Sequence, residues 1–134
     1  PRGGDEVNII KPGQNYGWPI TTHGLDYNGA YVSPFQEREG IESAAHIWVP
    51  SIAPSGLAVY EGDAFAAWRG NLFVGALVNN DVRRLTLEGD TVVAEEILFT
   101  ELDQRIRDIR VSPDGLLYII TDGAQGQVVR VSPK

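Results

Sequence analysis

Two arginines, Arg105 and Arg107, are separated by a single residue in a segment whose composition favours a β-strand. Side chains two positions apart on a strand project from the same side, so the two guanidinium groups can converge on one ligand. Each guanidinium is a planar fork of N–H donors that matches a carboxylate, so this pair suits a ligand that carries several carboxylates. The alternative is that the neighbouring Asp103 and Asp108 absorb both arginines in surface salt bridges.

A second candidate lies near the start of the chain, where Asp5 and Glu6 are followed by a turn that contains Tyr16. Glu6 offers a hard carboxylate, and the turn can direct the backbone carbonyl of Tyr16 toward the same point. Oxygen ligands of this kind suit Ca²⁺. The alternative is a solvated acidic pair at the start of a strand.

The two histidines are weak candidates for catalysis. His23 lies in an irregular segment, and His46 begins a strand-like segment beside Trp48. No serine stands in a G-x-S-x-G motif, so the sequence does not indicate serine-based nucleophilic catalysis. We interpret both histidines as structural or loop residues.

The composition limits the possible partners. The 134 residues are 43% hydrophobic, which can supply a core, and they carry a net charge of −7 without a basic cluster. We therefore expect no nucleic-acid partner, because phosphate binding needs concentrated Lys and Arg. The absence of cysteine excludes disulfides and thiolate metal sites. No apolar run is long enough to span a bilayer.

Short segments rich in β-branched or aromatic residues, separated by Gly, Pro, Asn and Asp, predict an all-β chain. The predicted strands are residues 5–10, 46–49, 56–60, 72–77, 82–87, 92–99, 106–111, 116–120 and 127–131. Residues 17–50 are irregular up to the strand at 46–49. Their aromatic residues argue against disorder, and a long loop of this kind is usually functional.

The strands after residue 54 repeat. GNLFVGAL at 70–77 aligns with GLLYIITD at 115–122, and DVRRLTLEGD at 81–90 aligns with GQVVRVSPK at 126–134. A unit of about 45 to 50 residues with four strands is typical of a β-propeller blade. We therefore predict an arc of about two to three four-stranded blades; the alternative is a small β-sandwich.

Within this arc, residues 1–134 are predicted to be the C-terminal part of a single propeller domain. Residues 1–50 would be the end of one blade with a long loop, 51–100 a complete blade, and 101–134 a last blade that is one strand short. In closed propellers the last blade often borrows a strand from the other chain terminus, which removes the open edge. The chain also begins without Met, so its natural start is expected to lie upstream.

The motif GGDEVN at 3–8, followed by GQNYGWP at 13–19, resembles the glucose/sorbosone dehydrogenase family. Further matches lie at 73–77, 104–108 and 113–118, so the resemblance covers nearly the whole chain. The family includes soluble aldose sugar dehydrogenases that use pyrroloquinoline quinone (PQQ), and its fold is a six-bladed propeller. PQQ is a planar quinone with three carboxylates.

The resemblance implies PQQ and Ca²⁺ as cofactors. The cofactor-contacting positions of the family match Tyr27, Ala76, Leu77, Val78, Arg105, Ile106 and Arg107. Its calcium-binding positions match Glu6, Tyr16 and Pro1. The ring of Tyr27 could lie against a flat quinone, or it could pack the long loop onto its blade. Val78 departs from relatives that have Lys here, so one charged contact to the cofactor is lost or supplied elsewhere.

The activity implied is oxidation of an aldose at C1 to the lactone, with hydride transfer to PQQ and reoxidation by an external electron acceptor. The catalytic histidine of the family lies on an early blade, upstream of this chain, so this chain supplies no catalytic residue and is expected to be inactive without its N-terminal blades. The alternatives are a non-enzymatic or degenerate ligand-binding propeller, and one chain of a split propeller. The resemblance also implies a periplasmic or secreted protein.

Overall fold

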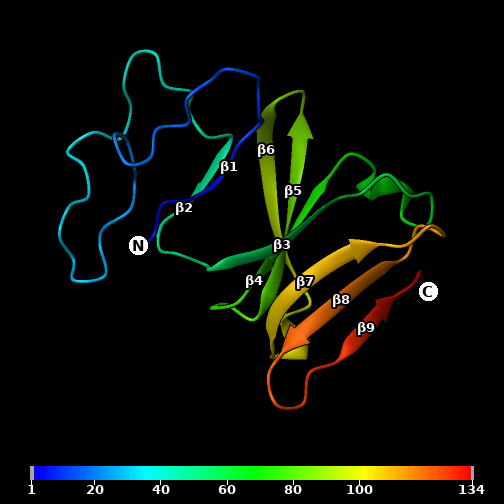
Figure 1. Ribbon diagram of the computed structural model, residues 1–134. Coiled ribbons are helices and arrows are strands. Elements are labelled where there is room, and N and C mark those ends of the chain that lie inside the picture. The colour runs from blue at the N-terminus through cyan, green and yellow to red at the C-terminus, as the bar shows by residue number, and fades with distance from the viewer. Residues whose placement is uncertain (1, 134) are drawn as a thin grey trace. The chain divides into compact units, whose positions relative to one another are not determined.

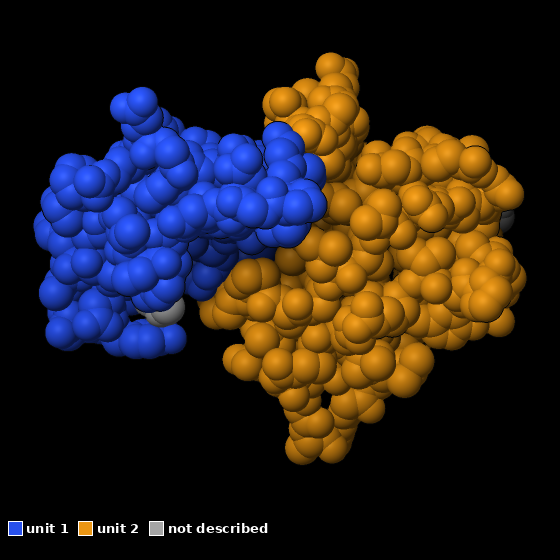
Figure 2. Space-filling view, turned by 45° about the horizontal axis from the view of Figure 1, so that its top comes forward, with its two compact units in different colours: residues 1–52 blue, residues 53–134 orange. Residues whose placement is uncertain are grey.

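The computed structural model describes residues 2–133, which divide after Ile52 into two compact units (Figure 2). Within the described range the regular elements are strands and two 3₁₀ turns, and there is no α-helix. The all-β prediction is therefore confirmed. No helix in this range is long and apolar enough to cross a membrane.

The first unit contains one short antiparallel pair, β1 (Asp5–Val7) and β2 (His46–Trp48), and a long loop between them (Figure 1). Val7 and Trp48 are buried and anchor the pair. The sequence predicted a strand over residues 5–10, but β1 ends at Val7 because β2 offers a partner for three residues only. Ile10 is consequently exposed.

The second unit contains two antiparallel sheets in which consecutive strands are neighbours. The first sheet consists of β3 (Pro54–Val59), β4 (Leu72–Ala76), β5 (Asp81–Glu88) and β6 (Thr91–Leu98). The second consists of β7 (Arg105–Val111), β8 (Leu117–Asp122) and β9 (Val128–Val131). The 3₁₀ turns are η1 (Ala66–Trp68) and η2 (Thr100–Leu102). A four-stranded sheet followed by a three-stranded one is the repeat that the sequence predicted.

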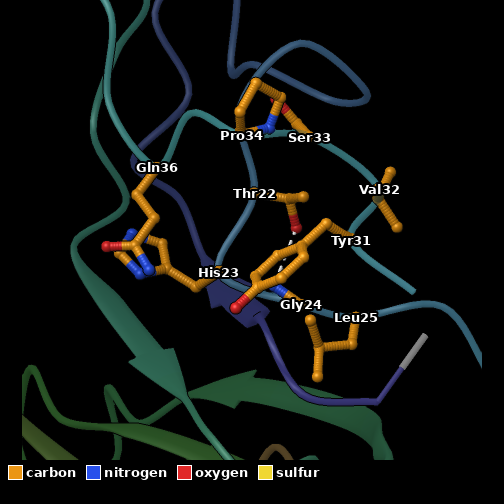
Figure 3. A pocket seen from close by; sticks show the side chains of 9 residues that line it. All are labelled: Thr22, His23, Gly24, Leu25, Tyr31, Val32, Ser33, Pro34 and Gln36. Atoms are coloured by element: carbon orange, nitrogen blue, oxygen red, sulfur yellow. Dashed lines mark hydrogen bonds between the residues drawn. The ribbon is translucent and has the colours of Figure 1, made fainter. Parts of the chain in front are cut away.

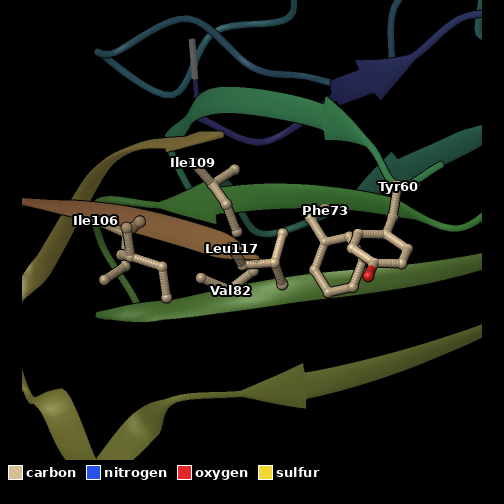
Figure 4. Close-up of a cluster of buried hydrophobic side chains, with 7 residues drawn as sticks. Tyr60, Phe73, Val82, Ile106, Ile109 and Leu117 are labelled. Atoms are coloured by element: carbon tan, nitrogen blue, oxygen red, sulfur yellow. The ribbon is translucent and has the colours of Figure 1, made fainter. Parts of the chain in front are cut away.

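The core of the second unit lies where the two sheets pack against each other, chiefly between β3, β4 and β7. It is formed by fully buried side chains from both sheets (Figure 4): Tyr60, Phe73, Val82, Ile106, Ile109, Leu117 and Ile119. The sheets approach so closely at Gly75 that a Cβ there would lie 2.8 Å from a side-chain carbon of Ile106. A residue larger than glycine would therefore force the sheets apart.

Strand β7 contains a β-bulge, because its register against β8 shifts between Ile106 and Asp108. Ile106 lies opposite Thr121 and Asp108 lies opposite Ile120, so Arg107 is the extra residue. The bulge lets Ile106 and Ile109, three positions apart, both face the core, where neither is exposed to solvent. In a strand of strict period two, one of them would face outward.

Candidate functional site

Arg105 and Arg107 converge on one carboxylate, that of Asp122 at the end of β8. The same oxygen, Oδ2 of Asp122, accepts hydrogen bonds from Nε of Arg105 at 3.2 Å and from Nη2 of Arg107 at 2.8 Å. Half of each arginine side chain (52%) remains exposed. Hydrogen bonds from Arg107 and then Arg105 lower the pKa of Asp122, so this carboxylate is ionised at neutral pH.

The two guanidinium groups converge, as the spacing predicted, but on a carboxylate of the protein. A surface ion pair is what the alternative expected, although with other partners. Asp108 pairs with Nε of Arg110 at 3.0 Å, and Asp103 accepts a hydrogen bond of 3.4 Å from Asn80. Sequence reasoning missed Asp122. The repeat could have indicated it. The alignment of GLLYIITD with GNLFVGAL pairs Asp122 with Leu77, which is one of the predicted cofactor contacts.

The structure also brings the segment after β4 close to β7. The hydroxyl of Ser55 lies 3.0 Å from the carbonyl oxygen of Gly75 and 2.7 Å from that of Ile106, and it bridges the two sheets. Predicted cofactor contacts at 76–78 and 105–107 thus begin on neighbouring backbone segments.

A cavity of about 270 Å³ lies beside Arg105. The residues that line it are Asn80, Asp103, Gln104, Arg105, Asp122, Gly123 and Gln125.

The predicted cofactor residues of the second unit differ in which of their atoms a ligand could contact. Ala76 and Ile106 are fully buried, so only their main-chain atoms could face a ligand. Leu77 is half-buried, and its N–H donates to the carbonyl of Ala53 at 3.1 Å. Val78 is 63% exposed and offers an apolar surface. Arg105 and Arg107 are thus the residues of this set that have charged side chains at the surface.

In the first unit, Glu6 and Tyr16 line one cavity of about 110 Å³. The hydroxyl of Tyr16 accepts from the N–H of Lys11 and donates to the carbonyl of Ile9, so it is used within its own loop. Among residues 2–133 no group of three His, Cys, Asp or Glu side chains is placed to hold a metal ion. A cation here would therefore have fewer than three such side chains as ligands, and neutral oxygens would supply the rest. Pro1, the third predicted calcium position, lies outside the described residues.

Asn8 is a further residue at this site that sequence reasoning did not single out. Its Nδ2 donates to Oε2 of Glu6 at 3.1 Å, while its buried Oδ1 has no hydrogen-bond partner in the described structure. Buried polar atoms are usually satisfied. An unsatisfied oxygen on a residue that touches the carboxylate of Glu6 is compatible with an oxygen-liganded cation at this site.

Tyr27 stands on the long loop with 78% of its surface exposed. A cavity of about 430 Å³ lies on the same loop, and Tyr31 and His23 contribute to its wall (Figure 3). The hydroxyl of Thr22 is used within the loop, since it accepts from the N–H of Gly24 at 3.0 Å. Tyr27 does not belong to the lining of this cavity.

Antiparallel sheets of four and three consecutive strands, packed face to face, are the arrangement of neighbouring β-propeller blades. The profile of the "Glucose / Sorbosone dehydrogenase" family matches residues 1–130, and the chain belongs to this family.

Among curated proteins, the chain is 44% identical to the aldose sugar dehydrogenase YliI of Escherichia coli over the whole chain. The match covers 37% of that protein, so the chain spans little more than a third of its relative's length. A crystal structure of a glucose dehydrogenase matches the whole chain with a TM-score of 0.93 and 47% identity, and the match covers 39% of that chain. The soluble aldose sugar dehydrogenase of Escherichia coli, in its apo-form, matches the whole chain with a TM-score of 0.92 and 43% identity, over 39% of its own chain.

The names of two more distant matches refer to the quinone cofactor. Quinoprotein glucose dehydrogenase B of Acinetobacter calcoaceticus is 25% identical over 92% of this chain and 37% of its own length. The PQQ-bound aldose sugar dehydrogenase of Streptomyces coelicolor shares the fold, with a TM-score of 0.67 at 24% identity over 96% of this chain and 36% of its own.

Proposed function

We propose that this chain supplies part of the cofactor site of a PQQ-dependent dehydrogenase that oxidises aldose sugars at C1 to the lactone. The observation that carries the proposal is the convergence of Arg105 and Arg107 on one side of β7 with half of each side chain still exposed. Family membership and the names of the quinoprotein relatives supply the identity of the ligand.

PQQ, when bound, would supply the redox chemistry by accepting the hydride from the sugar. The residues of this chain would bind and orient it. Arg105 and Arg107 can each form charge-assisted hydrogen bonds with a carboxylate, because Asp122 engages only one nitrogen of each guanidinium in the hydrogen bonds described. The exposed side chain of Val78 can contact an apolar ring surface but cannot pair with an oxygen, so the arginines carry the charge recognition here.

Calcium is the second cofactor that we propose. The carboxylate of Glu6, the main-chain carbonyl of Tyr16 and the unsatisfied Oδ1 of Asn8 are the oxygens that we expect to bind this ion. Ca²⁺ accepts carboxylate, carbonyl and amide oxygens in flexible geometry, which suits such a set. The role of this ion would be structural, because a cation would hold the start of β1 to the long loop.

The rest of the enzyme is expected outside this chain. We propose that the N-terminal blades carry the general base, that the chain alone does not turn over, and that an external acceptor reoxidises the cofactor. A periplasmic or secreted setting is part of the same proposal. The match to about 37% of the E. coli relative is consistent with a larger protein.

The test uses the full-length protein that contains this chain, supplied with PQQ and Ca²⁺. We expect reduction of an artificial electron acceptor with aldoses, and quenching of tryptophan fluorescence on titration with PQQ. The exposure of Val78, where a lysine would add a charged contact, favours a second candidate: a propeller that binds a ligand without turnover. PQQ binding without acceptor reduction for any aldose would support that candidate, and failure to bind PQQ would exclude the proposed enzyme.

A further inference from the structure

We propose that Asp122 is a positioning residue that holds Arg105 and Arg107 in one fixed arrangement for an incoming polycarboxylate. The proposal rests on the proposed function for the identity of that ligand. Its starting point is geometric, since both guanidinium groups donate to a single oxygen, Oδ2 of Asp122.

The contact with Asp122 orients the arginines without saturating them. Arg105 donates through Nε, which leaves its two terminal nitrogens outside the described hydrogen bond. Arg107 donates through Nη2, which leaves Nε and Nη1. A guanidinium has donors on two edges, and a carboxylate on one edge leaves the other able to meet a ligand. The exposed half of each side chain is consistent with this arrangement.

Arg105 and Arg107 of β7 reach Asp122 from different positions in the register. Arg105 lies directly opposite Asp122. The bulge places Arg107 between the residues that face Thr121 and Ile120, and its Nη2 lies 2.8 Å from Oδ2 of Asp122. The two guanidinium groups therefore meet the same carboxylate from neighbouring positions of β7.

Asp122 is itself attached to a rigid frame. The neighbouring Thr121 is buried, and it exchanges two hydrogen bonds with Gln127, through its N–H at 3.0 Å and through its Oγ1 at 2.9 Å. Ile119, two residues farther back on β8, belongs to the fully buried core. The carboxylate is therefore fixed by the sheet, whereas the arginine side chains are long and flexible.

A shared carboxylate has two consequences for ligand binding. It offsets the repulsion between two neighbouring cations, and it orders both side chains before the ligand arrives, so that binding does not have to order them. One carboxylate balances only one of the two positive charges, so the pair keeps an attraction for anions.

The direction in which Asp122→Asn changes the affinity for PQQ distinguishes a positioning role from competition between Asp122 and the ligand for the arginines. We expect Asp122→Asn, in the full-length protein with Ca²⁺, to weaken PQQ binding about tenfold, although it removes a negative charge. A carboxylate that merely competed with the ligand would give the opposite result, tighter binding that weakens with added salt. Tighter or unchanged PQQ binding in D122N would overturn the proposal.

Two further variants control the experiment. Glu96→Gln removes an equal charge from a half-exposed carboxylate on β6, which pairs with Arg84 on β5, and it should leave PQQ affinity unchanged. Asp122→Glu keeps the charge but moves the carboxylate, and it should weaken binding by a smaller factor than D122N. If circular dichroism shows that D122N does not fold, the PQQ affinity of D122E is the deciding measurement. A wild-type affinity in D122E would then refute the positioning role.

Failure of the proposed function would look different. If the wild-type protein binds no PQQ, the proposed function fails, and titration with citrate, a tricarboxylate without a quinone, tests the arginine pair by itself. Citrate binding that D122N weakens would sustain the positioning role without PQQ. Citrate binding that D122N strengthens, or no citrate binding, would refute both.

Discussion

Two clusters in the second unit combine arginine with carboxylates in opposite ratios. On β5, Arg83 is almost fully buried and donates to both oxygens of Asp81, at 2.8 and 2.9 Å, and to Glu95 at 2.8 Å. On β7, two half-exposed arginines share the single carboxylate of Asp122. The first cluster uses all three guanidinium nitrogens, and the second leaves most of them available.

The difference shows how burial and stoichiometry separate a structural ion pair from a ligand site. Burial alone would lower the pKa of Arg83, but the hydrogen bonds that Arg83 donates to Asp81 and Glu95 outweigh it, so the pKa is raised and the charge is kept. A buried charge needs this complete set of partners. An exposed pair tolerates an incomplete set, and a polycarboxylate can complete it.

The largest effect should follow from breaking the buried cluster. We expect Asp81→Asn to lower the free energy of unfolding by about 3 kcal/mol, because it leaves Arg83 buried with only Glu95 as a charged partner. Chemical denaturation of the full-length protein measures this. Glu96→Gln, at an exposed pair, should change it by about 0.5 kcal/mol or less. Equal effects of the two variants would show that the buried cluster is not structural.

An intermediate effect is expected at the exposed cluster, and on a different property. Arg105→Gln and Arg107→Gln should each weaken PQQ binding about tenfold, because each removes a charge-assisted contact to a ligand carboxylate. Their free energy of unfolding should stay within about 0.5 kcal/mol of wild type, because the ion pairs are solvent-exposed. Calorimetric titration measures the first quantity and chemical denaturation the second. A stability loss like that of Asp81→Asn would remove the contrast between the clusters.

The smallest effect concerns the titration of Asp122. Its pKa lies below the ordinary value of 3.8, with Arg107 as the largest cause and Arg105 next. The sign follows from linkage: the ion pair contributes fully above that ordinary value and is lost as the pH falls through the lowered pKa. Carboxyl NMR titration should show a larger upward shift in Arg107→Gln than in Arg105→Gln. The reverse order would mean that Arg105 makes the main contact.

Local pattern was sufficient to predict most of the fold. Alternating β-branched residues and the two aligned repeats located the strands of both sheets in the second unit. The predicted strand at 5–10 was too long, because its length depends on how much of β2 lies opposite. That is a property of pairing across some 40 residues of loop, and nothing in DEVNII reports it.

The site was harder to predict, because its partners meet through cross-strand register. Asp122 lies 15 residues from Arg107, and the β7–β8 pairing brings them together. Arg83 and Arg84 are adjacent in the sequence, yet one is buried with Asp81 and the other pairs with Glu96. The alternation of a strand predicts opposite faces, but the identity of each partner requires the structure.

The bulge makes Arg107 dispensable to the hydrophobic core. With that residue deleted, Ile106 would still face Thr121, Asp108 would still face Ile120, and Ile109 would still face Ile119. Strand β7 would become regular, and no residue of the core would change sides. Folding alone would therefore not preserve a residue at this position during evolution, and sequences that share this fold without its ligand would be free to lose it.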